Sequence, residues 1–131
     1  MKKIKSILLI LLITSLLFIL TGCGSNDPLT ATKTDVDSTE TTVVEFSNGK
    51  GTKVKTTIVY NNKESAQAMY TSATEMSTLD QNKNMLVQIN GNIIIITNTM
   101  DSYAAHMGFN ADKLGRDDIK TYFETSGYKV K

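Results

Sequence analysis

The chain has 131 residues, a formal net charge of +1 and 21% charged residues, which fits a single domain. Its lysines are scattered rather than clustered, so the charge pattern excludes a dedicated polyanion-binding protein and gives no platform for nucleic acid. The single cysteine excludes an intrachain disulfide, so the folded part must be held together by its hydrophobic core.

The N-terminal segment has the pattern of a secretory signal. Lys2, Lys3 and Lys5 form a cationic start, and an apolar run follows from Ile7 to Leu20. This run is shorter than the roughly 20 apolar residues that a membrane-spanning helix needs. A charged start, a short apolar run and small residues behind it indicate an export signal that is later removed.

The stretch Leu20-Thr21-Gly22-Cys23 ends this signal and reads as a lipobox. With this motif, residues 1–23 resemble the precursors of bacterial lipoproteins. The resemblance implies cleavage between Gly22 and Cys23 and a diacylglycerol on the Cys23 sulfur, and no other cofactor is expected. Two acyl chains suffice for stable anchoring. The alternative, an uncleaved signal anchor, is disfavoured because the one cysteine lies where the cut should fall.

The resemblance also implies a location on the outer face of the cytoplasmic membrane. Removing residues 1–22 takes away three lysines and no acidic residue, so the exported part is slightly acidic. Frequent Lys, Asn, Ile and Thr beside a single Pro favour an AT-rich, Gram-positive genome. We therefore expect membrane contact through the lipid and no contact with nucleic acid.

Residues 23–41 are predicted to be the lipidated cysteine and a flexible tether. They are rich in Ser, Asn, Asp, Thr and Lys and contain few large apolar side chains, so they bury too little to become ordered. The folded domain is then expected to span residues 42–131.

Residues 42–61 are predicted to form a β-hairpin with a loop at residues 49–51. With this loop, Glu45 lies opposite Lys55, an opposite-charge pair across the strands. The other face is apolar, and its members are Val44, Phe46, Val54 and Ile58, with Phe46 opposite Val54.

Residues 62–78 are predicted to form a helix. Asn62 is a suitable N-cap, and Glu64 suits the positive first turn. Apolar residues recur at spacings of three and four and predict one buried stripe, made of Ala66, Met69, Tyr70, Ala73 and Met76.

Residues 84–98 are predicted to form a second hairpin around an Asn90-Gly91 turn. This turn places Ile89 opposite Asn92. One face then carries Met85, Val87, Ile89, Ile94 and Ile96, and the other carries Leu86, Gln88, Ile93, Ile95 and Thr97. Both faces are substantially apolar, unlike those of the first hairpin.

The C-terminal third is predicted to be helical and interrupted. A short helix over residues 100–107 ends at Gly108, and a better one over residues 117–126 ends at Gly127. Residues 128–131 could add a short last strand. The elements together predict an α+β domain with the order ββαββα, in which a single antiparallel sheet of about four strands, built from two hairpins, carries helices on one side.

This layout also resembles that of the small YehR-like lipoproteins. The resemblance is carried by the lipobox, by the hairpin–helix–hairpin order and by the closing stretches Ile119-Lys120-Thr121-Tyr122-Phe123 and Ser126-Gly127-Tyr128-Lys129-Val130. It implies a surface lipoprotein and transfers no functional residues.

Candidate catalytic and metal-binding residues do not combine into a site. His106 is the only histidine, and no spacing ties it to Asp101 or Asp112 in a metal geometry. The pair Asp117-Asp118 is better explained by a helix N-terminus than by acid–base chemistry. We therefore predict no catalytic and no metal site and expect a non-enzymatic protein; a pocket joining His106 to an Asp or Ser would revive a hydrolase.

The second apolar face of the 84–98 hairpin is the one feature that indicates function. If it is uncovered, Leu86, Ile93 and Ile95, with Gln88 and Thr97 at the rim, form an apolar patch that could bind a partner; the alternative is cover by a C-terminal helix. We expect a tethered module that binds or modulates an envelope protein. The runner-up is a small-ligand or substrate-capture lipoprotein, which needs a concave pocket with convergent polar groups.

Overall fold

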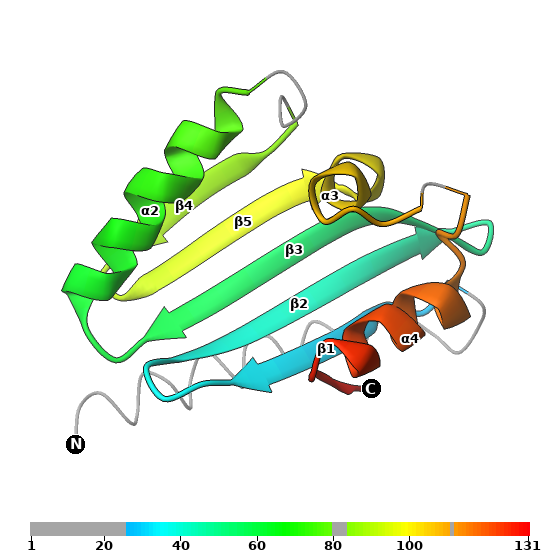
Figure 1. Cartoon of the computed structure of the whole chain (residues 1–131), viewed down its shortest axis with the longest axis horizontal. Helices are drawn as coiled ribbons and strands as arrows, with labels where there is room; N and C mark the ends of the chain where they lie inside the picture. Colours follow the sequence, from blue (N-terminus) through cyan, green and yellow to red (C-terminus); the bar gives the residue numbers. More distant parts are fainter. Residues whose placement is uncertain (1–25, 80–83, 111) are drawn as a thin grey trace.

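The computed structural model describes residues 26–79, 84–110 and 112–131. These residues form a six-stranded antiparallel sheet with three helices on one face (Figure 1). The strand order is β4-β5-β3-β2-β1-β6. The strands are β1 (Leu29–Thr34), β2 (Ser38–Ser47), β3 (Lys50–Tyr60), β4 (Leu86–Asn90), β5 (Ile93–Thr99) and β6 (Lys129–Val130), and the helices are α2 (Lys63–Ser77), α3 (Met100–His106) and α4 (Arg116–Thr125). The predicted α+β class is confirmed, but the sheet has six strands instead of four.

The additional strand β1 corrects the predicted tether. Residues 29–34 and 38–41 belong to the sheet, and β1 pairs with β2 from Leu29 opposite Val44 to Thr34 opposite Thr39. Leu29 and Ala31 are 1% and 0% exposed. The pattern was missed because only two apolar residues, Leu29 and Ala31, alternate with threonine and lysine. The folded domain therefore includes residues 29–41, and the order is βββαββαα with a short last strand.

The first hairpin has the predicted faces in a different register. Val44 lies opposite Val54, and Glu45 lies opposite Lys53 rather than Lys55. The cause is a two-residue turn at Asn48-Gly49, where φ is 52° and 76°, together with a register shift between Glu45 and Phe46. Before this shift the register differs by two residues, so the side chains keep their faces. Beyond this shift Phe46 lies opposite Gly51 rather than the predicted Val54. All four predicted apolar residues are buried.

The register of the second hairpin also differs from the predicted one by two residues. Ile89 lies opposite Ile94, and the turn residues are Gly91 and Asn92, with a positive φ of 61° at Gly91. Asn92 is fixed to the end of β3, because its side-chain amide donates to the Tyr60 carbonyl (2.6 Å) and its carbonyl accepts from the Tyr60 N–H (2.9 Å). The predicted two faces of the hairpin are preserved.

The helices begin and end close to the predicted residues. The Asn62 side chain caps α2 by accepting from the Ser65 N–H at 2.8 Å. Gly108 and Gly127 follow α3 and α4 with φ of 70° and 89°, a conformation that favours glycine at a helix end. The short last strand is confirmed as β6, which pairs with β1. In the described parts of the chain, no helix is long and apolar enough to cross a membrane.

The core on the helix-bearing face consists of two clusters. One lies between the β1–β3 region and α3 and α4, and it is centred on Phe123, whose ring contacts Tyr103, Tyr122 and Tyr128. The other lies under α2 and includes Ile58, Ala66 and Ile94. Thr56 stands between Val54 of the first cluster and Ile58 of the second, opposite Thr42. A polar seam therefore separates the two clusters.

Candidate functional site

The sequence-predicted patch lies on the sheet face opposite the helices. Leu86 lies directly opposite Thr97, and Gln88 lies opposite Ile95, so these side chains share a face with Ile93. Leu86 is 56% exposed. Ile93, Ile95 and Thr97 are partly exposed and Gln88 is exposed. All five residues therefore come together, as a patch on β4 and β5.

The C-terminal helices do not cover this patch. The buried residues of α3 and α4, such as Met100 and Phe123, pack with Leu29 and Val44 on the other face of the sheet. The expected alternative, cover by a C-terminal helix, is therefore wrong. Binding of a partner to the patch stays a hypothesis.

The patch borders an edge of the sheet, because β4 is the outermost of the strands that the structure describes. In a hairpin with a two-residue turn, the residues that flank the turn form a hydrogen-bonded pair, and such pairs alternate along the ladder. Since Asn90 and Ile93 flank the turn, the N–H and C=O groups of Val87 and Ile89 point away from β5. The sequence LVQIN of β4 has no charge or proline, the features that usually protect an edge.

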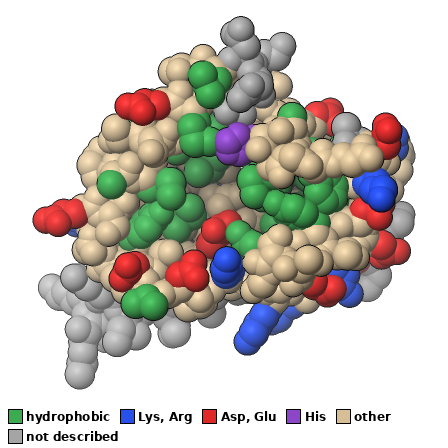
Figure 2. Space-filling model, in the orientation of Figure 1, with side chains coloured by type: hydrophobic (Ala, Val, Ile, Leu, Met, Phe, Trp, Pro, Cys, Tyr) green, Lys and Arg blue, Asp and Glu red, His purple; other side chains and the backbone are tan. Residues whose placement is uncertain are grey.

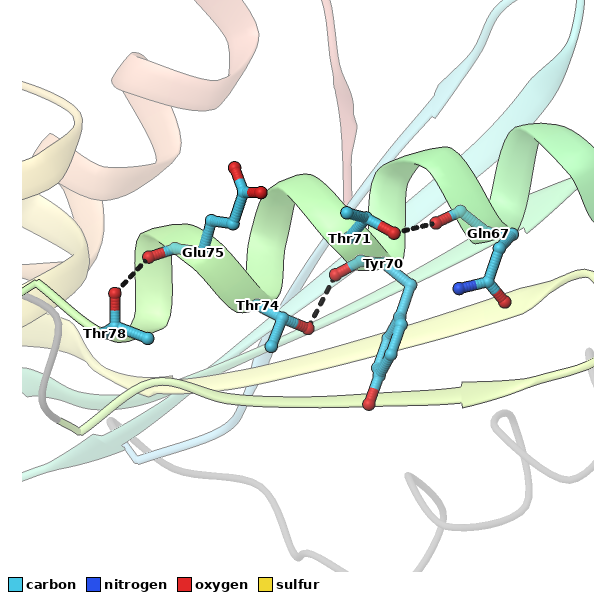
Figure 3. A pocket seen from close by; sticks show the side chains of 6 residues that line it. All are labelled: Gln67, Tyr70, Thr71, Thr74, Glu75 and Thr78. Atoms are coloured by element: carbon cyan, nitrogen blue, oxygen red, sulfur yellow. Dashed lines mark hydrogen bonds between the residues drawn. The ribbon is translucent and has the colours of Figure 1, made fainter.

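A groove of about 290 Å³ runs along the flank of α2 and is lined by Gln67, Tyr70, Thr71, Thr74, Glu75 and Thr78 (Figure 3). The threonine hydroxyls donate back to helix carbonyls, at 3.0 Å for Thr71, 2.7 Å for Thr74 and 2.7 Å for Thr78. The groove wall therefore offers threonine methyl groups rather than free hydroxyls. Tyr70 extends from α2 toward the sheet and packs in the cluster that contains Val87 and Ile89 of β4.

A second candidate site, a hydrogen-bonded group of polar side chains that the sequence did not predict, lies in the polar seam. Glu40 Oε1 accepts from the Tyr128 hydroxyl at 2.7 Å and from the Thr42 hydroxyl at 3.3 Å. The Thr42 and Thr56 hydroxyl oxygens lie 3.1 Å apart. Figure 2 looks onto this face and shows a hollow between two groups of hydrophobic side chains, with acidic atoms between them.

The negative charge of Glu40 affects four tyrosines, and one of them, Tyr128, contacts it directly. Burial raises the pKa of Tyr103, and the nearby Tyr122 and the negative charge of Glu40 raise it further. Burial also raises the pKa of Tyr128, and the hydrogen bond to Glu40 raises this pKa further. Tyr60 and Tyr122 also have a raised pKa, mainly through burial and in part through the Glu40 charge. The four phenols therefore lie within electrostatic reach of one carboxylate.

This arrangement was missed because its members are far apart in the sequence. Glu40 was assigned to the tether, so its position on β2 beside Thr42 carried no weight. Tyr128 comes from the residues before β6, and Tyr103 comes from α3. The one local signal is the alternation of Glu40, Thr42 and Val44, which places all three on one face of a strand.

The other sequence candidates lie apart from both features. His106 is exposed in the last turn of α3, and Asp117 and Asp118 occupy the first turn of α4 as predicted. Over residues 26–79, 84–110 and 112–131, no three His, Cys, Asp or Glu side chains are grouped so that they could hold a metal ion. Gly22 and Cys23, the predicted cleavage and lipidation residues, lie outside the described residues.

Comparison of the chain with models of protein families, with curated proteins and with solved structures found no match. The function of this protein is therefore inferred from its own residues.

Proposed function

We propose that this protein is a lipid-anchored extracytoplasmic module that binds an extended segment of another envelope protein along β4. The observation that carries the proposal is an uncharged edge strand with the α2 groove on one side and the Leu86 patch on the other. No catalytic role is part of the proposal.

The backbone of β4 supplies the main contacts. An added strand would pair with the outward N–H and C=O groups of Val87 and Ile89, as in other cases in which a peptide extends a sheet. Its alternate side chains would point to the two faces of the sheet. One set would reach the groove beside Tyr70 and the threonine methyl groups, and the other would extend the patch at Leu86.

The charge of the site indicates the chemistry of the partner. Among the described residues that line the groove, Glu75 is the only charged one, and β4 has none. An apolar, β-branched segment with a basic residue near Glu75 would therefore suit this edge better than an acidic one.

The lipid on Cys23 would limit the choice of partner to the envelope. Two acyl chains hold a protein stably at a membrane surface. Confinement to that surface raises the effective concentration of the module toward other envelope proteins. A modest affinity of β4 for its partner would then suffice.

Site-specific photo-crosslinking in intact cells tests the proposal. A photoreactive residue at position 86 should crosslink one envelope protein, whereas the same residue at the exposed Glu45, on the same face of the sheet but away from β4, should not. Equal crosslinking from both positions would contradict the proposal.

The substitution Val87→Pro tests the role of the backbone. It removes one outward N–H while leaving the hydrogen bonds of β4 to β5 in place. We expect the crosslinked product to fall by about tenfold or more, the effect of a lost hydrogen bond in a buried interface. Val87→Ala is the matched control, because it shortens the same side chain and keeps the N–H. Equal yields of crosslinked product from the two variants would contradict strand addition.

A further inference from the structure

We propose that the polar seam around Glu40 is a binding site for an organic cation that carries an ammonium group. The seam lies on the helix-bearing face of the sheet, opposite the Leu86 patch, so this inference goes beyond the binding of a protein partner and does not depend on it. It makes capture of a small ligand a second activity of the same module.

The floor of the seam is a carboxylate with its hydrogen bonds already in place. The single Thr42 hydroxyl proton is directed to Glu40, so Thr56 must donate to Thr42. The Tyr128 hydroxyl donates to the same oxygen, Oε1. Two hydroxyl groups thus donate to one negative charge and a third supports them through Thr42, while Glu40 Oε2 accepts no hydrogen bond among the described residues.

Glu40 forms no ion pair among the described residues. The ion pair found there joins Lys120 to Glu124 on the surface of α4 and does not involve Glu40. Lys33 lies opposite Glu40 on β1, but its ammonium nitrogen lies over the Tyr128 ring, 5.6 Å from the centroid. A partly buried carboxylate without a paired cation favours binding of a positive charge.

The walls of the seam suit an ammonium group. Tyr103, Tyr122 and Tyr128 pack against the cluster on one side of the seam, and Tyr60 packs against the cluster on the other side. Figure 2 shows the hollow between the two apolar groups. Aromatic rings attract ammonium groups, most strongly where water is excluded. The position of the Lys33 ammonium over Tyr128 shows that this wall already accepts such a group.

The donor set argues against a divalent metal ion. Calcium and magnesium need about six or more oxygen ligands, and the seam offers one carboxylate whose neighbouring hydroxyls point their protons at it. A single carboxylate beside aromatic rings matches an organic cation instead.

Titration with tetramethylammonium chloride tests the site on the full-length chain in uncharged detergent. Sodium chloride at equal ionic strength and tert-butanol serve as the salt and neutral controls. We expect saturable NMR shifts of the amides of residues 40, 42, 56 and 128, with a Kd of about 10 mM or tighter. The chain has five tyrosines and no tryptophan, so its fluorescence should change in parallel. Equal shifts with tert-butanol, or none that saturate, would overturn the inference.

Two variants change the affinity in opposite directions. Glu40→Gln removes the charge but keeps an oxygen that accepts the same hydrogen bonds, and it should weaken binding about tenfold or more. Lys33→Gln removes the neighbouring positive charge and should tighten binding about threefold. Glu45→Gln, on the same strand but on the other face, should leave the affinity unchanged.

The Lys33 variant keeps the inference testable if Glu40→Gln does not fold. An affinity that stays equal or falls in Lys33→Gln would overturn the inference, as would wild-type affinity in a folded Glu40→Gln. Tight binding lost in Glu45→Gln would assign the cation to the other face and also overturn it.

Discussion

At the scale of single residues, Gly51 lies where the sheet contacts α3 and α4. A Cβ atom at this position would lie 2.8 Å from Ile119 Cδ1 and 3.0 Å from Met100 Cγ. Gly51→Ala should therefore destabilise the fold by about 1–3 kcal/mol, the usual cost of overpacking a core. Urea unfolding measures this loss.

The control for Gly51→Ala is a second substitution at the contact itself. Ile119→Val removes the Cδ1 atom that the new methyl group would meet. The double variant should lose less stability than the sum of the two single losses. Strict additivity would show that the close approach to Ile119 is not the cause.

Because of its buried tyrosines, we expect the protein to lose stability at high pH. Burial, with the nearby Glu40 charge, raises the pKa of Tyr103 and Tyr128 in the folded state above the value of about 10 in the unfolded chain. The stability that these raised pKa values contribute is fully present below about pH 10. It is lost as the pH rises from there toward the pKa values of the two tyrosines in the folded state. The midpoint of thermal unfolding should fall above about pH 10.

Tyr128→Phe tests the origin of this pH dependence. It removes the phenol that donates to Glu40 at 2.7 Å and should lower stability at neutral pH by about 1–3 kcal/mol. The decline of the unfolding midpoint with pH should also become shallower. A decline as steep as that of the wild type would assign the effect to other groups.

At the scale of elements, β1 decides where the folded domain begins. It buries Leu29 and Ala31 and is the strand that pairs with β6. A fragment of residues 42–131 lacks these contacts and should lose about 5 kcal/mol or more, enough to abolish cooperative unfolding in most domains. A fragment of residues 26–131 is the control and should unfold cooperatively; equal unfolding midpoints for the two fragments would contradict the role of β1.

The sequence patterns predicted the helices and strands better than they predicted the registers between strands. Side-chain periodicity depends on which residues meet the core, so the stripe of α2 and the faces of both hairpins were predictable. The registers depend on contacts with a third strand, such as Asn92 with Tyr60, and on a bulge that no local pattern marks. β1 was missed because two apolar residues, Leu29 and Ala31, are a weak signal on their own.

The two candidate sites were predictable to different degrees for the same reason. The Leu86 patch comes from one hairpin, so local alternation was enough to assemble it. The seam joins Glu40, Thr56, Tyr103 and Tyr128 from four segments, and only the folded sheet brings them together.

At the scale of the whole molecule, the proposed anchor predicts location. Cys23→Ser removes the sulfur that would carry the diacylglycerol, and with it the two acyl chains that would hold the protein at the membrane. We expect the variant to leave the membrane fraction and to lose incorporation of a labelled fatty acid. Retention in the membrane without label would instead indicate an uncleaved signal anchor.

The most direct test of partner binding along β4 is hydrogen exchange of its backbone amides, with and without the crosslinked partner protein. In the free protein, the Val87 and Ile89 amides point outward and should exchange fast, whereas Gln88 faces β5 and should exchange slowly. In the complex, Val87 and Ile89 should become as protected as Gln88. Protection that appears elsewhere, with Val87 and Ile89 still exchanging fast, would contradict strand addition at this edge.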